Sequence, residues 1–156
     1  MIPVTQTWLR ILRLGLLLSS IGWGVSFVFT FSTWDSASNY LYQMGAGMMQ
    51  YKPLLDYWLR MASATFGCIG VASALACIRP AFFQGLILLL GPFHIFLGVV
   101  LTVAAVGNHL HAVSHATYVA DITFCFLTAI LIITPLVATC CRRHERTAAI
   151  VDGSLA

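Results

Sequence analysis

The chain has 156 residues, of which 60% are hydrophobic and only 8% are charged, whereas soluble domains carry about 25% charged residues. The composition excludes an ordinary soluble protein, because this number of charges cannot cover the surface of a soluble fold of this size. The formal net charge is only +3, and the arginines stand at the ends of apolar runs, which argues against a nucleic-acid partner. Because no linker divides the chain, residues 1–156 are expected to form a single membrane domain.

Four apolar runs are long enough to cross a bilayer, which takes about 20 residues of helix. They cover residues 14–31, 61–78, 81–106 and 118–140. The first run follows basic residues, as a signal peptide does, but it exceeds the usual stretch of about 7 to 15 apolar residues and no clear cleavage site follows. The sequence therefore predicts an all-α fold, an integral membrane four-helix bundle with antiparallel up-down-up-down crossings.

Six arginines fall on the same side of the membrane if the chain crosses it four times. They are Arg10, Arg13, Arg79, Arg142, Arg143 and Arg146. Since basic residues of short loops stay on the cytoplasmic side, both termini are predicted to be cytoplasmic, including a tail of residues 142–156.

The connections between the runs differ greatly in length. Ile78-Arg79-Pro80-Ala81 leaves almost no slack, which predicts an antiparallel hairpin with Pro80 in the first turn of the third span. The outer loop, residues 32–60, contains a stretch rich in tyrosine and methionine between residues 40 and 51. Two interpretations stay open for this stretch, a helix lying flat on the outer membrane surface or a lid packed over the bundle.

One face of the third span carries small and polar residues, and helices in lipid associate through such residues. The face comprises Gln84, Gly91, His94, Gly98, Thr102 and Ala105. His94 is an ionisable group near the middle of a span, where such groups are rare and often functional. It could hydrogen-bond a neighbouring helix, or it could contact a quinone, a haem or a pigment, with Gln84, Gly91 and Gly98 lining the space beside it.

Two opposite charges are expected at the same depth in the membrane. Arg60 opens the second span and Asp121 lies one turn into the fourth. Because an unpaired charge near hydrocarbon is costly, the sequence predicts an Arg60–Asp121 ion pair that clamps these spans together. An anion or proton site is the functional alternative, and Asp56, four residues before Arg60, is a competing partner.

The connection before the fourth span concentrates three of the five histidines, His109, His111 and His115. If this segment is helical, His111 and His115 share a face and could bind a divalent metal through their imidazole nitrogens. The alternative is a set of solvated histidines at the membrane surface.

Motifs of catalysis are missing from the sequence. It contains no glycine-rich phosphate loop, no nucleophile elbow and no HExxH motif, and its only glutamate is Glu145. The chain is therefore predicted to have no catalytic activity by itself.

The Trp58-Leu59-Arg60-Met61 start of the second span, the Arg79-Pro80 turn and Asp121 near the start of the last span resemble DoxX-like proteins and other small bacterial four-helix membrane proteins. The resemblance covers most of the chain at the level of hydropathy. It implies a multi-pass protein of the bacterial inner membrane. Since some members of that group are membrane subunits of quinone-linked oxidoreductases, it also implies a place beside redox enzymes.

Two hypotheses about function follow. The first is a non-catalytic small subunit or scaffold in the lipid bilayer, which packs against a larger membrane protein or against copies of itself. The second is a redox or cofactor-binding subunit that uses His94 or the loop histidines to hold a quinone, a haem, a pigment or a divalent metal.

Overall fold

The structure, a computed structural model, describes the backbone of residues 6–110 and 116–151 and the side chains of residues 6–110 and 117–140. Every regular element in this part is a helix. The helices are α1 Gln6–Gly24, α2 Phe27–Phe31, α3 Trp34–Gln43, α4 Pro53–Ile78, α5 Gln84–Gly107 and α6 Ala116–Val151. Four stretches are long and apolar enough to cross a membrane, as predicted: Gln6–Phe31, Pro53–Ile78, Gln84–Gly107 and Thr117–Cys140.

Three helices extend further than the apolar pattern predicts. α1 begins at Gln6 and not at residue 14. α4 begins at Pro53 rather than Met61, because a proline at the first helical position and Asp56 in the first turn both favour a helix start. The last eight residues of the predicted outer loop are therefore helical. α6 continues to Val151, so the predicted tail after residue 142 begins as an extension of the last span.

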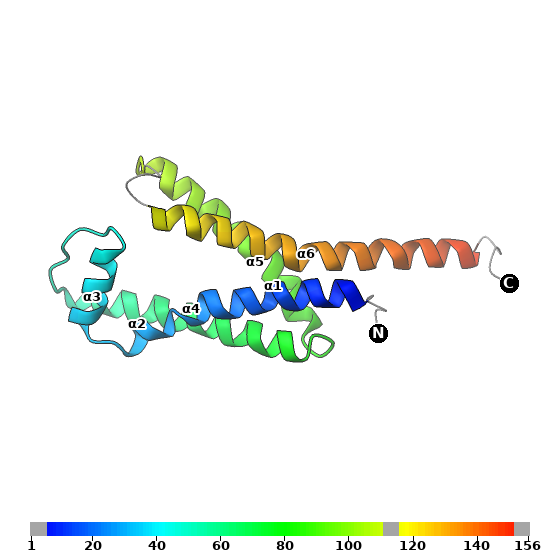
Figure 1. Cartoon of the computed structure of the whole chain (residues 1–156), viewed down its shortest axis with the longest axis horizontal. Helices are drawn as coiled ribbons and strands as arrows, with labels where there is room; N and C mark the ends of the chain where they lie inside the picture. The colour runs from blue at the N-terminus through cyan, green and yellow to red at the C-terminus, as the bar shows by residue number, and fades with distance from the viewer. Residues whose placement is uncertain (1–5, 111–115, 152–156) are drawn as a thin grey trace.

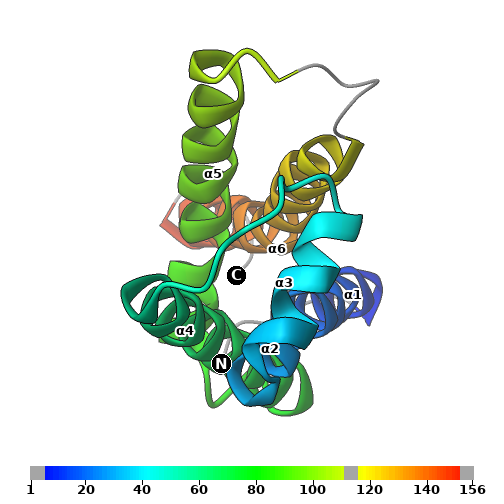
Figure 2. The same ribbon diagram turned by 90° about the vertical axis from the view of Figure 1, so that its left-hand side faces the viewer.

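α4 and α5 are joined by a tight turn, but α5 begins at Gln84 and not at Ala81. The Phe82 N–H donates to the Arg79 carbonyl (3.0 Å), which makes a β-turn with Pro80 at the second position, where its fixed φ fits. Beyond this turn α5 runs away from α4 and toward α6 (Figures 1 and 2). The predicted antiparallel hairpin is therefore correct at its turn and wrong along most of its length.

The main helix contacts are α1 with α4, α5 with α6, and α1 with α6, whereas α4 and α5 share only a small contact and α2 packs on α4. α1 is thus the helix that connects α4 to the α5–α6 pair. In Figure 1, α1 begins and α4 ends at the right-hand side, called the Arg79 end below, and α3 lies at the opposite side, called the α3 end.

The close contact of α1 and α4 depends on glycine. A Cβ atom on Gly70 of α4 would lie 2.5 Å from the backbone nitrogen of Gly24 and 2.7 Å from its Cα atom, which is too close for any side chain. The buried residues of α4 on this side are all small: Ser63, Gly67, Gly70, Ser73 and Ala76. Small residues allow helix backbones to approach closely in lipid.

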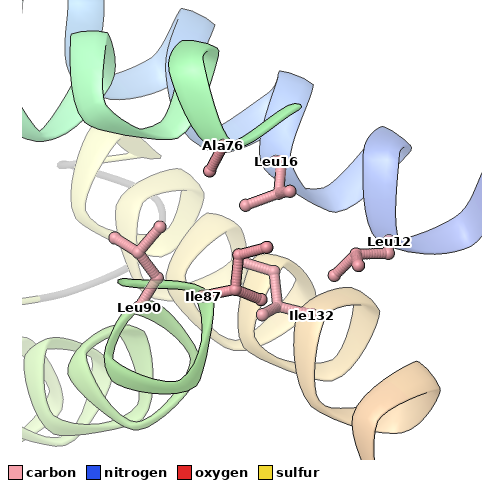
Figure 3. Packing of buried hydrophobic residues seen from close by; sticks show 6 residues of the cluster. All are labelled: Leu12, Leu16, Ala76, Ile87, Leu90 and Ile132. Carbon is pink, nitrogen blue, oxygen red and sulfur yellow. The ribbon is translucent and has the colours of Figure 1, made fainter. Parts of the chain in front are cut away.

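An apolar cluster fills the bundle toward the Arg79 end (Figure 3). Its fully buried members come from all four spans: Leu12, Leu16, Ala76, Ile87, Leu90 and Ile132. Leu90 is not part of the small and polar face of the third span, yet it is only 4% exposed. The inward face of α5 is therefore wider than its small and polar residues indicated, because Ile87 and Leu90 also turn toward α1 and α6.

α3 lies across one end of the bundle (Figure 2). Its inner side carries Trp34, Ala37 and Leu41, at helical spacing, and Ala37 is almost fully buried. Its outer side carries Asp35 and polar residues that are exposed. Thr117 of α6 also donates a hydrogen bond to the Met44 carbonyl just after α3 (3.3 Å). Most of the large side chains of the tyrosine- and methionine-rich stretch are nevertheless exposed, among them Tyr40, Met48 and Tyr51, so both interpretations of this stretch stay open.

Candidate functional site

His94 is completely buried in the middle of α5. Its Nδ1–H donates to the Leu90 carbonyl one turn earlier (2.7 Å). Its Nε2 atom lies 2.9 Å from the Trp23 indole nitrogen and 3.1 Å from the Ser19 hydroxyl, both on α1. Ser19 is in turn 2.8 Å from the hydroxyl of Ser73 on α4. The imidazole therefore joins three helices through one polar network.

The hydrogen-bond partners fix the protonation state of His94. The indole N–H can only donate, so Nε2 must accept, and Nδ1 must carry the proton that the Leu90 carbonyl accepts. An imidazolium would carry a second N–H facing the Trp23 donor. The network therefore holds His94 as the neutral Nδ1–H tautomer, and the lone pair that a haem iron or a zinc ion would need is already in use.

Aromatic rings enclose the imidazole on the side of the α3 end. Trp23 stacks on Phe66 of α4 (5.0 Å between ring centroids) and meets Phe124 of α6 edge-on (5.6 Å). The His94 ring is 5.9 Å from Trp23 and 6.3 Å from Phe124. We call Trp23, Phe66 and Phe124 the aromatic cluster. Because its rings come from α1, α4 and α6, it adds aromatic contacts to the α1–α4 and α1–α6 interfaces.

The glycines beside His94 do not leave room for a ligand. A Cβ atom on Gly91 would lie 2.6 Å from the Ile133 side chain, and one on Gly98 would lie 3.0 Å from the Phe126 ring. Both glycines instead let α6 pack closely against α5. Gln84 is exposed at the start of α5, so the predicted cofactor contacts of His94, Gln84, Gly91 and Gly98 do not surround one space.

Thr128 of α6 lies in the same layer as this network. Phe124, one turn before it, contacts Gly22 of α1, and Ile132, one turn after it, contacts Gly15. Ser19 lies midway between those glycines, so Thr128 faces it across the bundle. Thr128 is 0% exposed, and its hydroxyl has no hydrogen-bond partner. Other spanning threonines, Thr65, Thr102 and Thr139, donate to the carbonyl four residues earlier.

Arg60 does not pair with Asp121, so this prediction is wrong. Its Nε lies 3.1 Å from both carboxylate oxygens of Asp56, and its Nη1 donates to the Thr30 carbonyl (3.0 Å). α4 and α6 are not among the helix pairs that pack together. Arg60 instead pairs with Asp56, the competing partner four residues earlier, because α4 is already helical at Asp56.

Of the three histidines before the fourth span, only His109 lies among the residues that the structure describes. His111 and His115 lie outside the described residues, and within the described part of the chain no cluster of metal-ligating side chains is present. His109 has φ 52°, and its N–H donates to the Val106 carbonyl while that of Leu110 donates to Ala105. This is a Schellman motif, so His109 occupies the position that usually takes glycine at a helix C-terminus.

Trp23 is the site residue that the sequence analysis missed. No individual residue of the first apolar run, Trp23 included, was given a role in the sequence analysis. A signal was present, because an indole N–H placed within a span needs an acceptor. His94 was the one side-chain acceptor near mid-span on the third helix.

Comparisons with protein-family models, curated proteins and solved structures gave no match for this chain. The resemblance to DoxX-like proteins therefore stays a prediction.

Proposed function

We propose that the chain is a non-catalytic membrane subunit or scaffold, which acts by packing against a larger membrane protein or against copies of itself. The observation that supports this most is the use of His94. Both ring nitrogens of this buried side chain are committed to hydrogen bonds in a network that joins α1, α4 and α5. Such a network stabilises one arrangement of helices, as a scaffold requires.

The lipid-facing sides of the bundle offer a large surface for such packing. α5 in particular exposes large apolar side chains along its length: Leu88, Leu89, Phe96, Val99, Val103 and Val106. In the membrane this surface contacts either acyl chains or another apolar helix. A larger partner would cover part of it.

We further propose that the chain crosses up-down-up-down with both termini in the cytoplasm of a bacterial cell and with the α3 end outside. The six arginines named above support this orientation, since Arg10, Arg13 and Arg79 lie in α1 and the α4–α5 turn, at the Arg79 end. A single cysteine in place of exposed Gly47, in a variant lacking the native cysteines, should react with a membrane-impermeant thiol reagent added to intact cells. Reaction only after lysis would reverse the orientation.

Purification in a mild detergent tests the proposed function. We expect a colourless complex of defined mass that exceeds that of one chain, and crosslinks that involve the exposed face of α5. A monomer that carries one equivalent of quinone or haem would instead establish the cofactor-binding hypothesis, since its ligand would have had to displace Trp23 or Ser19 from His94.

A further inference from the structure

We propose that Asp121 and the aromatic cluster beside it bind an organic cation, an ammonium or phosphonium ion with an apolar or aromatic body, at the α3 end of the bundle. This activity goes beyond the scaffold function and does not depend on it.

Asp121 lies on the inward face of α6 but is not covered there. Cys125 and Thr128, on the same face and deeper in the bundle, are completely buried, whereas Asp121 is exposed. The last glycine of α1 that meets α6 is Gly22, which contacts Phe124. α1 then ends at Gly24, and α2 packs on α4 instead of α6. Asp121 therefore lies beyond the level at which α1 packs against α6.

The charge of Asp121 has no counterion within the described residues. Neither a hydrogen bond nor an ion pair reaches its carboxylate there, and Arg60 is bound to Asp56. Asp121 belongs to a membrane-spanning stretch, where an unpaired carboxylate costs free energy unless a cation or a proton neutralises it. Thr128, about two turns deeper on the same face, is a second polar group without a partner. This face of α6 thus carries two polar side chains without a partner among the described residues.

The surroundings of the carboxylate suit a cation with an apolar body. Phe124 follows Asp121 by three residues and is therefore its neighbour on the helix surface. Its ring belongs to the aromatic cluster with Trp23 and Phe66, and all three rings are only partly buried. One turn further out on α6, the Thr117 hydroxyl donates a hydrogen bond to the Met44 carbonyl, just after α3. A carboxylate next to Phe124 on the helix surface can provide ion pairing, and the ring can add a cation–π contact.

A metal ion fits this position less well. Divalent ions take several oxygen, nitrogen or sulfur ligands, and the described residues contain no group of three or more His, Cys, Asp or Glu side chains arranged to hold one. One carboxylate with aromatic neighbours matches a single positive charge on an organic body.

The full-length protein in detergent can be titrated with tetraphenylphosphonium, with triphenylphosphine oxide as an uncharged analogue, by calorimetry. We expect saturable binding of one cation per chain, and little binding of the uncharged analogue. Asp121→Asn should weaken binding at least tenfold, which corresponds to about 1.4 kcal/mol. Asp35→Asn, which removes an exposed carboxylate from α3, should leave the affinity unchanged.

Phe66→Leu keeps the side chain apolar while removing one ring of the aromatic cluster, and it should weaken binding several-fold. Absence of saturable binding to the native protein would overturn the proposal. So would equal affinities of the native protein and Asp121→Asn, or equal affinities for the charged and uncharged probes. These measurements use the isolated chain, so a negative result would leave the scaffold function standing.

Discussion

Two helix contacts of this protein differ in a way that the order of the chain does not predict. α4 and α5 are joined by a tight turn, yet they share only a small contact. α1 and α4 are separated by α2, α3 and the loop of residues 44–52, yet they form one of the two most extensive contacts of the bundle. Proximity in sequence therefore brings helix ends together without deciding which faces pack.

Side-chain size and polarity explain the difference. α4 presents a row of small residues to α1, so that Gly70 meets the backbone of Gly24. α5 presents Gly91 and Gly98 to α6 and sends His94 toward α1. In lipid, where apolar surface alone drives little association, close backbone approach and interhelical hydrogen bonds select the partners. α5 finds both on α6 and α1 rather than on α4.

The largest effect is expected from His94→Ala, which breaks the side-chain hydrogen bonds that link α5 to α1. The Trp23 N–H and the Ser19 hydroxyl would lose their acceptor, and a cavity would remain among the aromatic rings. We expect the free energy of unfolding to fall by about 3 kcal/mol, measured by thermal unfolding in detergent. Leu89→Ala, on the lipid-facing side of the same helix, is the control. Equal losses from both variants would show that the network does not hold α5 in place.

A glycine pair tests whether the α1–α4 contact depends on close approach. Gly70→Ala should destabilise the protein by about 1 to 3 kcal/mol, because the new methyl group would meet the backbone of Gly24 and push the helices apart. Gly85 in the first turn of α5 has open space around its Cα, so Gly85→Ala should be neutral or stabilising by up to about 1 kcal/mol. Unfolding curves of the two variants that shift in the same direction would contradict this account.

The ion pair at the start of α4 should contribute less, because its side chains are 38% and 20% exposed. A double-mutant cycle with Asp56→Asn and Arg60→Ala should give a coupling of about 0.5 kcal/mol. The same cycle with Asp121→Asn in place of Asp56→Asn should give none. A clear coupling between Arg60 and Asp121 would restore the clamp between α4 and α6 that the structure does not contain.

The smallest effect is expected at the turn between α4 and α5. Inserting two glycines between Ala81 and Phe82 should lower the free energy of unfolding by less than about 0.5 kcal/mol, because loop entropy grows slowly with length and the helices beyond the turn share little surface. A loss comparable to that of Gly70→Ala would mean that the turn determines where α5 packs.

The sequence alone determined the four spans and the inward direction of His94. Both follow from local chemistry. A bilayer requires about 20 apolar residues in a helix, and a polar side chain within such a helix must turn away from lipid. The same reasoning identified Gly91, Gly98 and Ala105 of α5 as inward residues, since it depends only on helical spacing. Pro53 and Asp56 also indicate the start of α4 in the sequence. The prediction missed this start because it followed only the apolar run, which begins at residue 61.

Only the tertiary structure decided which helix lies opposite each inward face. Arg60 and Asp121 were expected at the same depth, but they lie on helices that do not pack together, so depth could not identify their partners. Gly91 and Gly98 had indicated space beside His94, whereas Ile133 and Phe126 fill it. Trp23 became a partner of His94 because α1, and not α4, crosses α5 at that level. Helical periodicity gives the direction of a side chain around its own axis, and it contains no information about which neighbour that direction meets.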